Sequence, residues 1–278
     1  GSPWQQGTMT LRQIDRILQQ AKELGTIRWI YFEGGEPFLY HAILHRGARM
    51  AAQKRFQVGV VSNAYWATES EDALEWLRPF AGLIQDLSLS CDIYHGDEES
   101  NRRVRNARWA AEKLRIPLAA ISIAQPGATR VAPVSGQLPA GESPVVYRGR
   151  AVEKLAPRAA GGDWSEFTSC PCEDLRNPGR VHVDPFGNVH ICQGISIGNL
   201  FRKSLKTICA EYDPDAHPVT GPILEGGPAA LARRYDLPHA DTYADACHLC
   251  YAMRASLRSR FPEILTPDGM FGVFEESR

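Results

Sequence analysis

Apolar positions along the first half of the chain alternate between a helical period and short continuous runs. Residues 11–24 place their apolar side chains on one helix face. Thr10-Leu-Arg-Gln13 in front of them has the form of a capping box, and Gly25 is a natural stop. The same pattern predicts further helices at 41–55, 68–77 (behind a second capping box at Thr68) and 98–114, and strands at 27–32, 58–62, 83–90 and 118–123.

Helices that alternate with short apolar strands indicate an α/β fold with a parallel sheet, either open or curled into a barrel. The alternation begins with a helix, whereas a βα barrel begins with a strand. We therefore expect the first strand and its loop to be missing from this chain. Residues 125–143 are rich in Pro, Gly, Ala and Ser and have no periodicity, which predicts a long loop.

The pattern changes in the second half of the chain. The segment from Arg180 to Cys192 alternates with a period of two around Pro-Phe-Gly-Asn, which predicts a β-hairpin. Residues 242–260 predict a helix that carries Cys247 and Cys250 near its start. We expect two domains, a partial barrel over residues 1–155 and a small α+β cysteine-rich domain over residues 156–278.

The strand at 27–32 leads almost directly into Gly34-Gly35-Glu36-Pro37. Paired glycines allow a ligand to approach the backbone closely, and a carboxylate stands beside them. Because α/β folds place ligands at the carboxyl ends of parallel strands, this turn is a candidate ligand site.

Composition narrows the class of protein. With 44% hydrophobic and 23% charged residues the chain can bury an ordinary globular core. A formal net charge of -1 gives no general attraction to nucleic acid or to an anionic membrane. No apolar run approaches the roughly 20 residues that span a bilayer, and no signal peptide is visible. We expect a cytoplasmic protein without nucleic-acid or membrane partners.

The cysteines are the strongest chemical signal. An odd count of seven in a chain without a signal peptide argues against a disulfide framework. Cys172 (or Cys170), Cys192 and the Cys247/Cys250 pair could supply four thiolates to zinc or to an iron–sulfur cluster, and spacing alone slightly favours a structural zinc. Cys209 is expected in the core. Cys91 is expected to be a buried small residue, although its neighbours make it a candidate reactive group.

These segments resemble the radical S-adenosylmethionine enzymes. Tyr31 to Pro37 is similar to the family's Gly-Gly-Glu-Pro motif after the second barrel strand. Val181 to Ile208 is similar to a SPASM or twitch-type auxiliary domain, with Gly187-x4-Cys192 followed by Gly198-Asn199-Leu200. Gly149-Arg150-Ala151 resembles the segment that leads into such domains.

The resemblance implies a partial (β/α)6 TIM-type barrel that holds S-adenosylmethionine and a [4Fe-4S] cluster, which cleaves the cofactor to a 5′-deoxyadenosyl radical. Gly34, Gly35, Glu36 and Pro37 would bind the methionyl amino group. The positions matching ribose or carboxylate contacts are Ser62, Asn63, Ser90 and Asp92; ordinary strand-end capping explains each of them singly about as well. A twitch-like domain implies one auxiliary [4Fe-4S] cluster, with ligands among Cys170, Cys172, Cys192, Cys247 and Cys250.

The family's C-x3-C-x2-C loop, which ligates the catalytic cluster, is absent from this sequence. The catalytic cluster is therefore expected only with a missing N-terminal segment, and this chain alone should not cleave S-adenosylmethionine. The complete enzyme would act on a peptide or small-molecule substrate and take electrons from a reductant such as ferredoxin or flavodoxin. Groups expected to face the open end of the barrel are Cys91, Asp92, Tyr94 and His95. The alternative is a non-catalytic binding module with a structural zinc.

Overall fold

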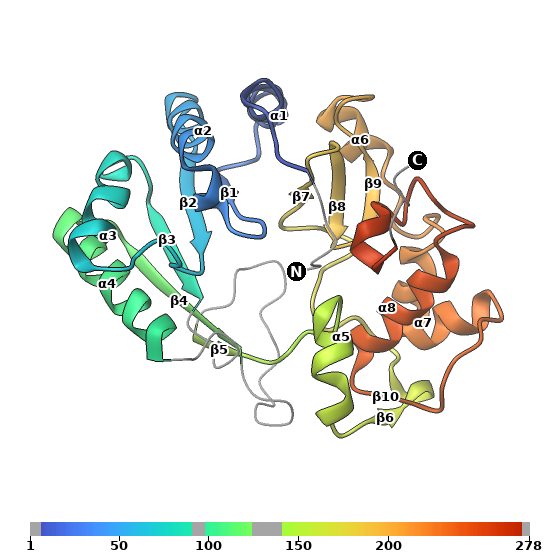
Figure 1. Ribbon diagram of the computed structural model, residues 1–278. Coiled ribbons are helices and arrows are strands. Elements are labelled where there is room, and N and C mark those ends of the chain that lie inside the picture. The colour runs from blue at the N-terminus through green and yellow to red at the C-terminus, as the bar shows by residue number, and fades with distance from the viewer. Residues whose placement is uncertain (1–6, 91–97, 124–140, 274–278) are drawn as a thin grey trace, which may run out of the picture. The chain divides into compact units, whose positions relative to one another are not determined.

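A parallel sheet and an antiparallel sheet lie in separate parts of the chain (Figure 1). The computed structural model describes residues 7–90, 98–123 and 141–273, and these divide into two units. Of the described residues, the sheet unit comprises 9–90, 98–123 and 141–143. The cysteine unit comprises residues 7–8 and 144–273. Residues 144–155, which the sequence places in the first domain, therefore lie in the second unit.

The sheet unit is α/β, as the sequence pattern predicts. Its strands are all parallel and lie in the order β1 (Trp29–Phe32), β2 (Gln57–Ser62), β3 (Asp86–Ser90), β4 (Leu118–Ile123) and β5 (Gly141–Ser143). Its helices are α1 (Leu11–Leu24), α2 (His41–Gln53), α3 (Ser70–Leu77) and α4 (Glu98–Leu114), with short 3₁₀ helices at Pro37–Tyr40 and Arg78–Phe80. The described strands form an open sheet rather than a closed barrel.

Local sequence explains where the first helix begins and ends. The backbone amide of Gln13 donates to the Thr10 hydroxyl, and the Thr10 amide donates to the Gln13 side chain at 2.8 Å, which confirms the capping box. Gly25 ends the helix at φ +81. The second capping box is wrong, because α3 starts at Ser70 and the Thr68 hydroxyl instead donates to Asp72.

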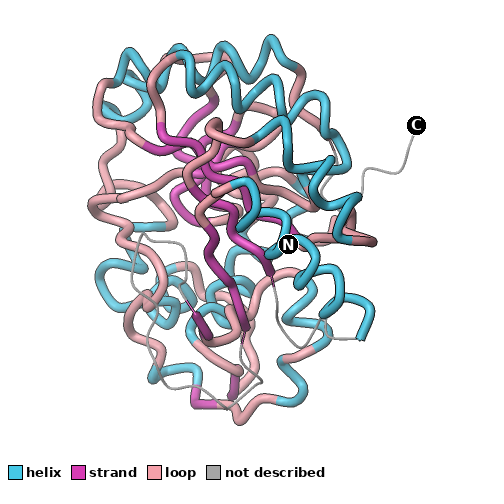
Figure 2. The backbone as a smooth tube through the Cα atoms, turned by 90° about the vertical axis from the view of Figure 1, so that its left-hand side faces the viewer, coloured by secondary structure: helices cyan, strands magenta, loops and turns pink. Residues whose placement is uncertain are grey.

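The core of the sheet unit lies between the strands and the helices. Val58, Val60, Leu87 and Leu89 are completely buried; because side chains two apart along a strand share a face, all four lie on one face of the sheet, in the same core as Leu44 and Ala48 of α2. The strands can be followed in Figure 2. None of the helices in the described ranges has the length and apolar character needed to cross a bilayer.

The cysteine unit is built on a three-stranded antiparallel sheet, β7 (His182–Val183), β8 (Asn188–Cys192) and β9 (Ile195–Asn199). β7 and β8 form the predicted hairpin. A second, two-stranded sheet pairs β6 (Gly162–Asp163) with β10 (Thr242–Tyr243). The helices are α5 (Arg150–Lys154), α6 (Leu205–Glu211), α7 (Thr220–Arg234) and α8 (Ala246–Leu257), with 3₁₀ helices at Ala156–Arg158, Trp164–Glu166 and Asp268–Phe271. Apolar side chains of β8, β9, α7 and α8 form one core.

Candidate functional site

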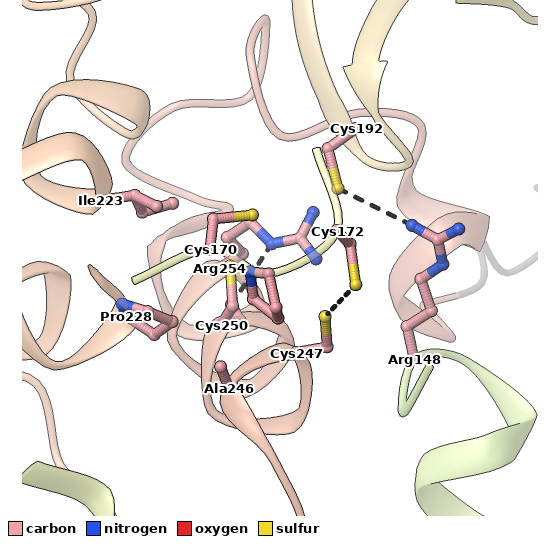
Figure 3. A pocket seen from close by; sticks show the side chains of 11 residues that line it. Arg148, Cys170, Cys172, Cys192, Ile223, Pro228, Ala246, Cys247, Cys250 and Arg254 are labelled. Atoms are coloured by element: carbon pink, nitrogen blue, oxygen red, sulfur yellow. Dashed lines mark hydrogen bonds between the residues drawn. The ribbon is translucent and has the colours of Figure 1, made fainter. Parts of the chain in front are cut away.

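Five thiols converge on one cavity of the cysteine unit (Figure 3). The cavity is lined by Cys170, Cys172, Cys192, Cys247 and Cys250, together with Arg148, Pro171, Ile223, Pro228, Ala246 and Arg254. These cysteines span eighty residues of sequence, and all five are the candidates that the sequence singles out. The structure brings both Cys170 and Cys172 to the cavity, so the choice between them stays open.

The ligand candidates come from three separate segments. Cys170 and Cys172 flank Pro171 in the irregular segment after the 3₁₀ helix at Trp164–Glu166. Cys192 is the last residue of β8, and Cys247 and Cys250 lie in the first turns of α8. All three segments pack against one apolar core, and a centre bound by their cysteines would add a further link between them.

Asp245 and two of the cavity cysteines lie at the N-terminal end of α8. Asp245 caps the helix, since its carboxylate accepts a hydrogen bond of 2.7 Å from the His248 amide. Burial raises the pKa of Asp245 to about 6, although hydrogen bonds from the His248, Cys247 and Tyr147 backbone oppose the shift. The helix dipole places partial positive charge near Cys247 in the first turn, but the Asp245 carboxylate at the same helix end contributes to raising the pKa of that thiol.

A kink in α7 positions the segment that carries Cys170 and Cys172. Gly227 has φ +68, and a Cβ there would collide with the backbone of residues 167–169. Immediately after it, the Ala229 amide donates to the Phe167 carbonyl at 3.2 Å. Gly227 is thus a site residue that our sequence reasoning missed; the Gly226-Gly227-Pro228 sequence was the available signal.

The sulfur atoms are not arranged as a ready-made shell for one ion. Cys172 Sγ and Cys247 Sγ are 3.4 Å apart and share a hydrogen bond, while Arg148 Nη1 donates to Cys192 Sγ at 3.7 Å. Within the described part of the chain, no three metal-binding side chains are grouped closely enough to hold a metal ion. The positions shown therefore bring the donors to one cavity without specifying a coordination geometry.

Burial raises the pKa of most of these thiols. It raises the pKa of Cys170 to about 12, with a further contribution from Cys192, and it also raises the pKa of Cys250. The hydrogen bond between Cys172 and Cys247 lowers the pKa of the first and raises that of the second. A bound cation is the ordinary means of deprotonating such buried thiols.

The chemistry of the donor set fits a thiolate-bound centre. Sulfur ligands select zinc or iron–sulfur clusters over hard cations such as magnesium. Five cysteines exceed the four ligands that either centre requires.

Cys209 does not line the cavity. Its expected place in the core is wrong, because it is exposed on α6.

In the sheet unit, the Gly-Gly-Glu-Pro turn follows β1 and is tied to the end of β2. Glu36 is only 7% exposed, and its carboxylate accepts hydrogen bonds from the Phe38 amide (3.1 Å), the Ser62 hydroxyl (3.0 Å) and the Asn63 amide (2.8 Å). Burial raises the pKa of Glu36 despite these bonds. A carboxylate has about four acceptor positions, so the described donors use three of them.

The neighbours of Glu36 are held in the same network. Ser62 Oγ also accepts from Trp66 Nε1 at 2.9 Å, and the Asn63 side chain accepts from the Tyr65 amide at 3.0 Å. These contacts are strand-end capping, and Trp66 is a member that the sequence did not indicate. Ser90 ends β3 at the same edge of the sheet, because parallel pairing aligns the carboxyl ends of β2 and β3.

The two glycines of the turn leave the backbone accessible. Gly34 and Gly35 are exposed, and a Cβ on either would meet none of the described atoms within 4 Å. The remaining candidates of the sheet unit, Cys91, Asp92, Tyr94 and His95, lie outside the described residues.

The chain matches no protein-family model and no curated protein.

Proposed function

We propose that this chain is the cofactor- and substrate-holding part of a radical S-adenosylmethionine enzyme whose cysteine unit binds an auxiliary [4Fe-4S] cluster. The observation that carries this proposal is the convergence of five cysteines on one cavity from three segments. The Gly-Gly-Glu-Pro turn at the carboxyl edge of a parallel sheet supports it independently. The sheet unit would then be part of a (β/α)6 barrel.

In this proposal the protein's own residues position and shield the bound groups. The exposed backbone at Gly34 and Gly35 would receive the methionyl amino group of S-adenosylmethionine through its carbonyl oxygens, while Glu36 holds the turn against β2. Ser62 and Asn63 would act mainly through that network. Four of the five cavity cysteines would ligate the auxiliary cluster, and that cluster would supply electron transfer or a substrate anchor. A peptide or small molecule is the proposed substrate, and ferredoxin or flavodoxin the proposed reductant.

The first experiment is metal analysis of the chain purified without oxygen. A [4Fe-4S] centre requires brown protein with about four irons and four sulfides per chain. Colourless protein free of iron and sulfide would contradict the auxiliary cluster. The barrel half of the proposal is tested separately by isothermal titration of the chain with S-adenosylmethionine, in which wild type is compared with a Gly34→Val, Gly35→Val double variant. Equal affinity would exclude the glycine turn as the binding site.

A non-catalytic module with a structural zinc is the second candidate, and one distance favours it. In a tetrahedral site with Zn–S bonds of about 2.3 Å, neighbouring sulfurs lie about 3.8 Å apart. The Cys172 and Cys247 sulfurs, at 3.4 Å, are close to that spacing. One zinc per chain, retained in air and without sulfide, would establish this alternative.

A further inference from the structure

Arg254 is a buried cation among the cavity thiols. It lies on α8, one turn after Cys250, and is only 2% exposed. Its Nε donates to the Cys250 carbonyl at 3.2 Å and its Nη1 donates to the Gln193 carbonyl at 2.7 Å. These two bonds hold the guanidinium between α8 and the turn that joins β8 to β9, where Figure 3 shows it among the sulfur atoms.

Among the residues that the structure describes, no carboxylate forms an ion pair with Arg254. Two buried carboxylates of this unit have partners of their own: Glu173 pairs with Arg180 at 3.0 Å, and Asp184 pairs with His190 at 3.0 Å. The groups whose negative charge would act on Arg254 are all cavity thiols: Cys250, Cys192, Cys247 and Cys170.

A guanidinium does not lose its proton in proteins, and a buried ion without a counter-charge is strongly unfavourable. Neutral thiols cannot supply that counter-charge. Four thiolates on either Zn²⁺ or a [4Fe-4S]²⁺ core carry a net charge of about −2, which requires compensation of the opposite sign. Arg254 therefore complements a filled thiolate centre and is poorly matched to an empty cavity of thiols.

We propose that Arg254 is the counter-charge of the thiolate centre, assisted by Arg148 at Cys192, and that it raises the affinity of the cavity for its metal and eases any reduction of it. This role rests on the proposed metal centre, because it concerns the charge of that centre. Arg254 is a positioning residue in this scheme. It donates to backbone carbonyls next to the ligands, and it acts on the metal through its charge.

The test compares Arg254→Met, which removes the charge with little change in volume, with Arg254→Lys, which keeps the charge but cannot form the same two-carbonyl fork. Arg202→Met is the matched control, since Arg202 is an exposed arginine of the same unit that pairs with Glu263 at the surface. Metal affinity is measured by competition with a chelator, using the metal that purifies with the wild-type chain. For an iron–sulfur centre, the reduction potential is measured as well.

Arg254→Met should bind the metal at least tenfold more weakly than wild type, and an iron–sulfur form should have a more negative potential. Arg254→Lys should keep its affinity within about threefold of wild type, and Arg202→Met should be unchanged. If Arg254→Met keeps the wild-type metal affinity and reduction potential, Arg254 is not the counter-charge of the thiolate centre. If Arg254→Met does not fold, Arg254→Lys decides: loss of metal in that variant shows that the fork geometry matters and overturns the charge argument. A wild-type chain that binds neither iron nor zinc overturns the metal centre itself.

Discussion

The carboxylate of Glu36 accepts a hydrogen bond of 2.8 Å from the backbone amide of Asn63. This bond joins the turn after β1 to the residue that follows β2, so two strand ends at one edge of the sheet are held together by a single buried side chain. The geometry of the Gly-Gly-Glu-Pro turn thus depends on the pairing of two strands.

Removing the Glu36 carboxylate should destabilise the sheet unit. Glu36→Ala leaves the Phe38 and Asn63 amides and the Ser62 hydroxyl without their acceptor, and the expected loss is about 3 kcal/mol. Glu36→Gln keeps one oxygen acceptor and should lose only about 1 kcal/mol. Urea unfolding at pH 7 measures both. Glu112→Ala, at an exposed position of α4, is the control and should stay within about 0.5 kcal/mol of wild type. Equal losses in both Glu36 variants would contradict the network.

The kink of α7 should tolerate no side chain at Gly227. A Cβ there meets the backbone of residues 167–169, which cannot move as a side chain can, so Gly227→Ala should cost at least about 3 kcal/mol and weaken metal binding. Gly226→Ala is the matched control, because its Cβ meets only the Ala230 methyl, at 3.1 Å. Thermal unfolding and metal content check both variants, and a Gly226→Ala as damaged as Gly227→Ala would show that the kink as a whole, and not this contact, is responsible.

Cavity thiols and the surface thiol should differ in metal binding. Cys192→Ala and Cys250→Ala each remove a donor that lines the cavity, and we expect at least a tenfold loss of metal affinity in each. Cys209→Ala removes the exposed thiol of α6 and should bind the metal as wild type does. Metal analysis after gel filtration provides the measurement. Full metal content in both cavity variants would mean that our ligand set is wrong.

The hairpin should lose stability in acid through Asp184. Burial opposes ionisation of this carboxyl, but hydrogen bonds from His190 and Asn188 outweigh it and lower the pKa of Asp184. Because its folded pKa lies below the unfolded value of about 3.9, its contribution is present above about pH 4 and is lost as the pH falls through the folded pKa.

Asp184→Asn should therefore be less stable than wild type by about 2 kcal/mol at pH 7, and the difference should shrink in acid. Unfolding by urea at pH 7 and at pH 3 measures it. The control is Asp174→Asn, at an exposed carboxyl of the same unit. If the difference in unfolding free energy between wild type and Asp184→Asn grows in acid, the pKa of Asp184 is not lowered by folding.

Much of the fold could be predicted because its signals are local. The capping box at Thr10, the helix at 98–114, the strand at 118–123 and the hairpin that ends at Cys192 all depend on side chains a few residues apart. The two-unit organisation was also visible as a change of period. The boundary was placed later than the structure has it, since residues 144–155 contain no signal that shows which unit they pack against.

The candidate site, like the fold, could be predicted only in part from the sequence. The sequence by itself determined which residues could bind metal, because clustered cysteines have few other uses in such a chain. It could not show that both Cys170 and Cys172 reach the cavity, that Cys209 is exposed, or that Arg254 lies buried among the thiols. Those facts depend on how α7 and α8 pack against the hairpin, and packing joins residues up to eighty positions apart. Local patterns determined many of the elements and the candidate cysteines, and only the tertiary structure decided which cysteines share a cavity and what charge faces them.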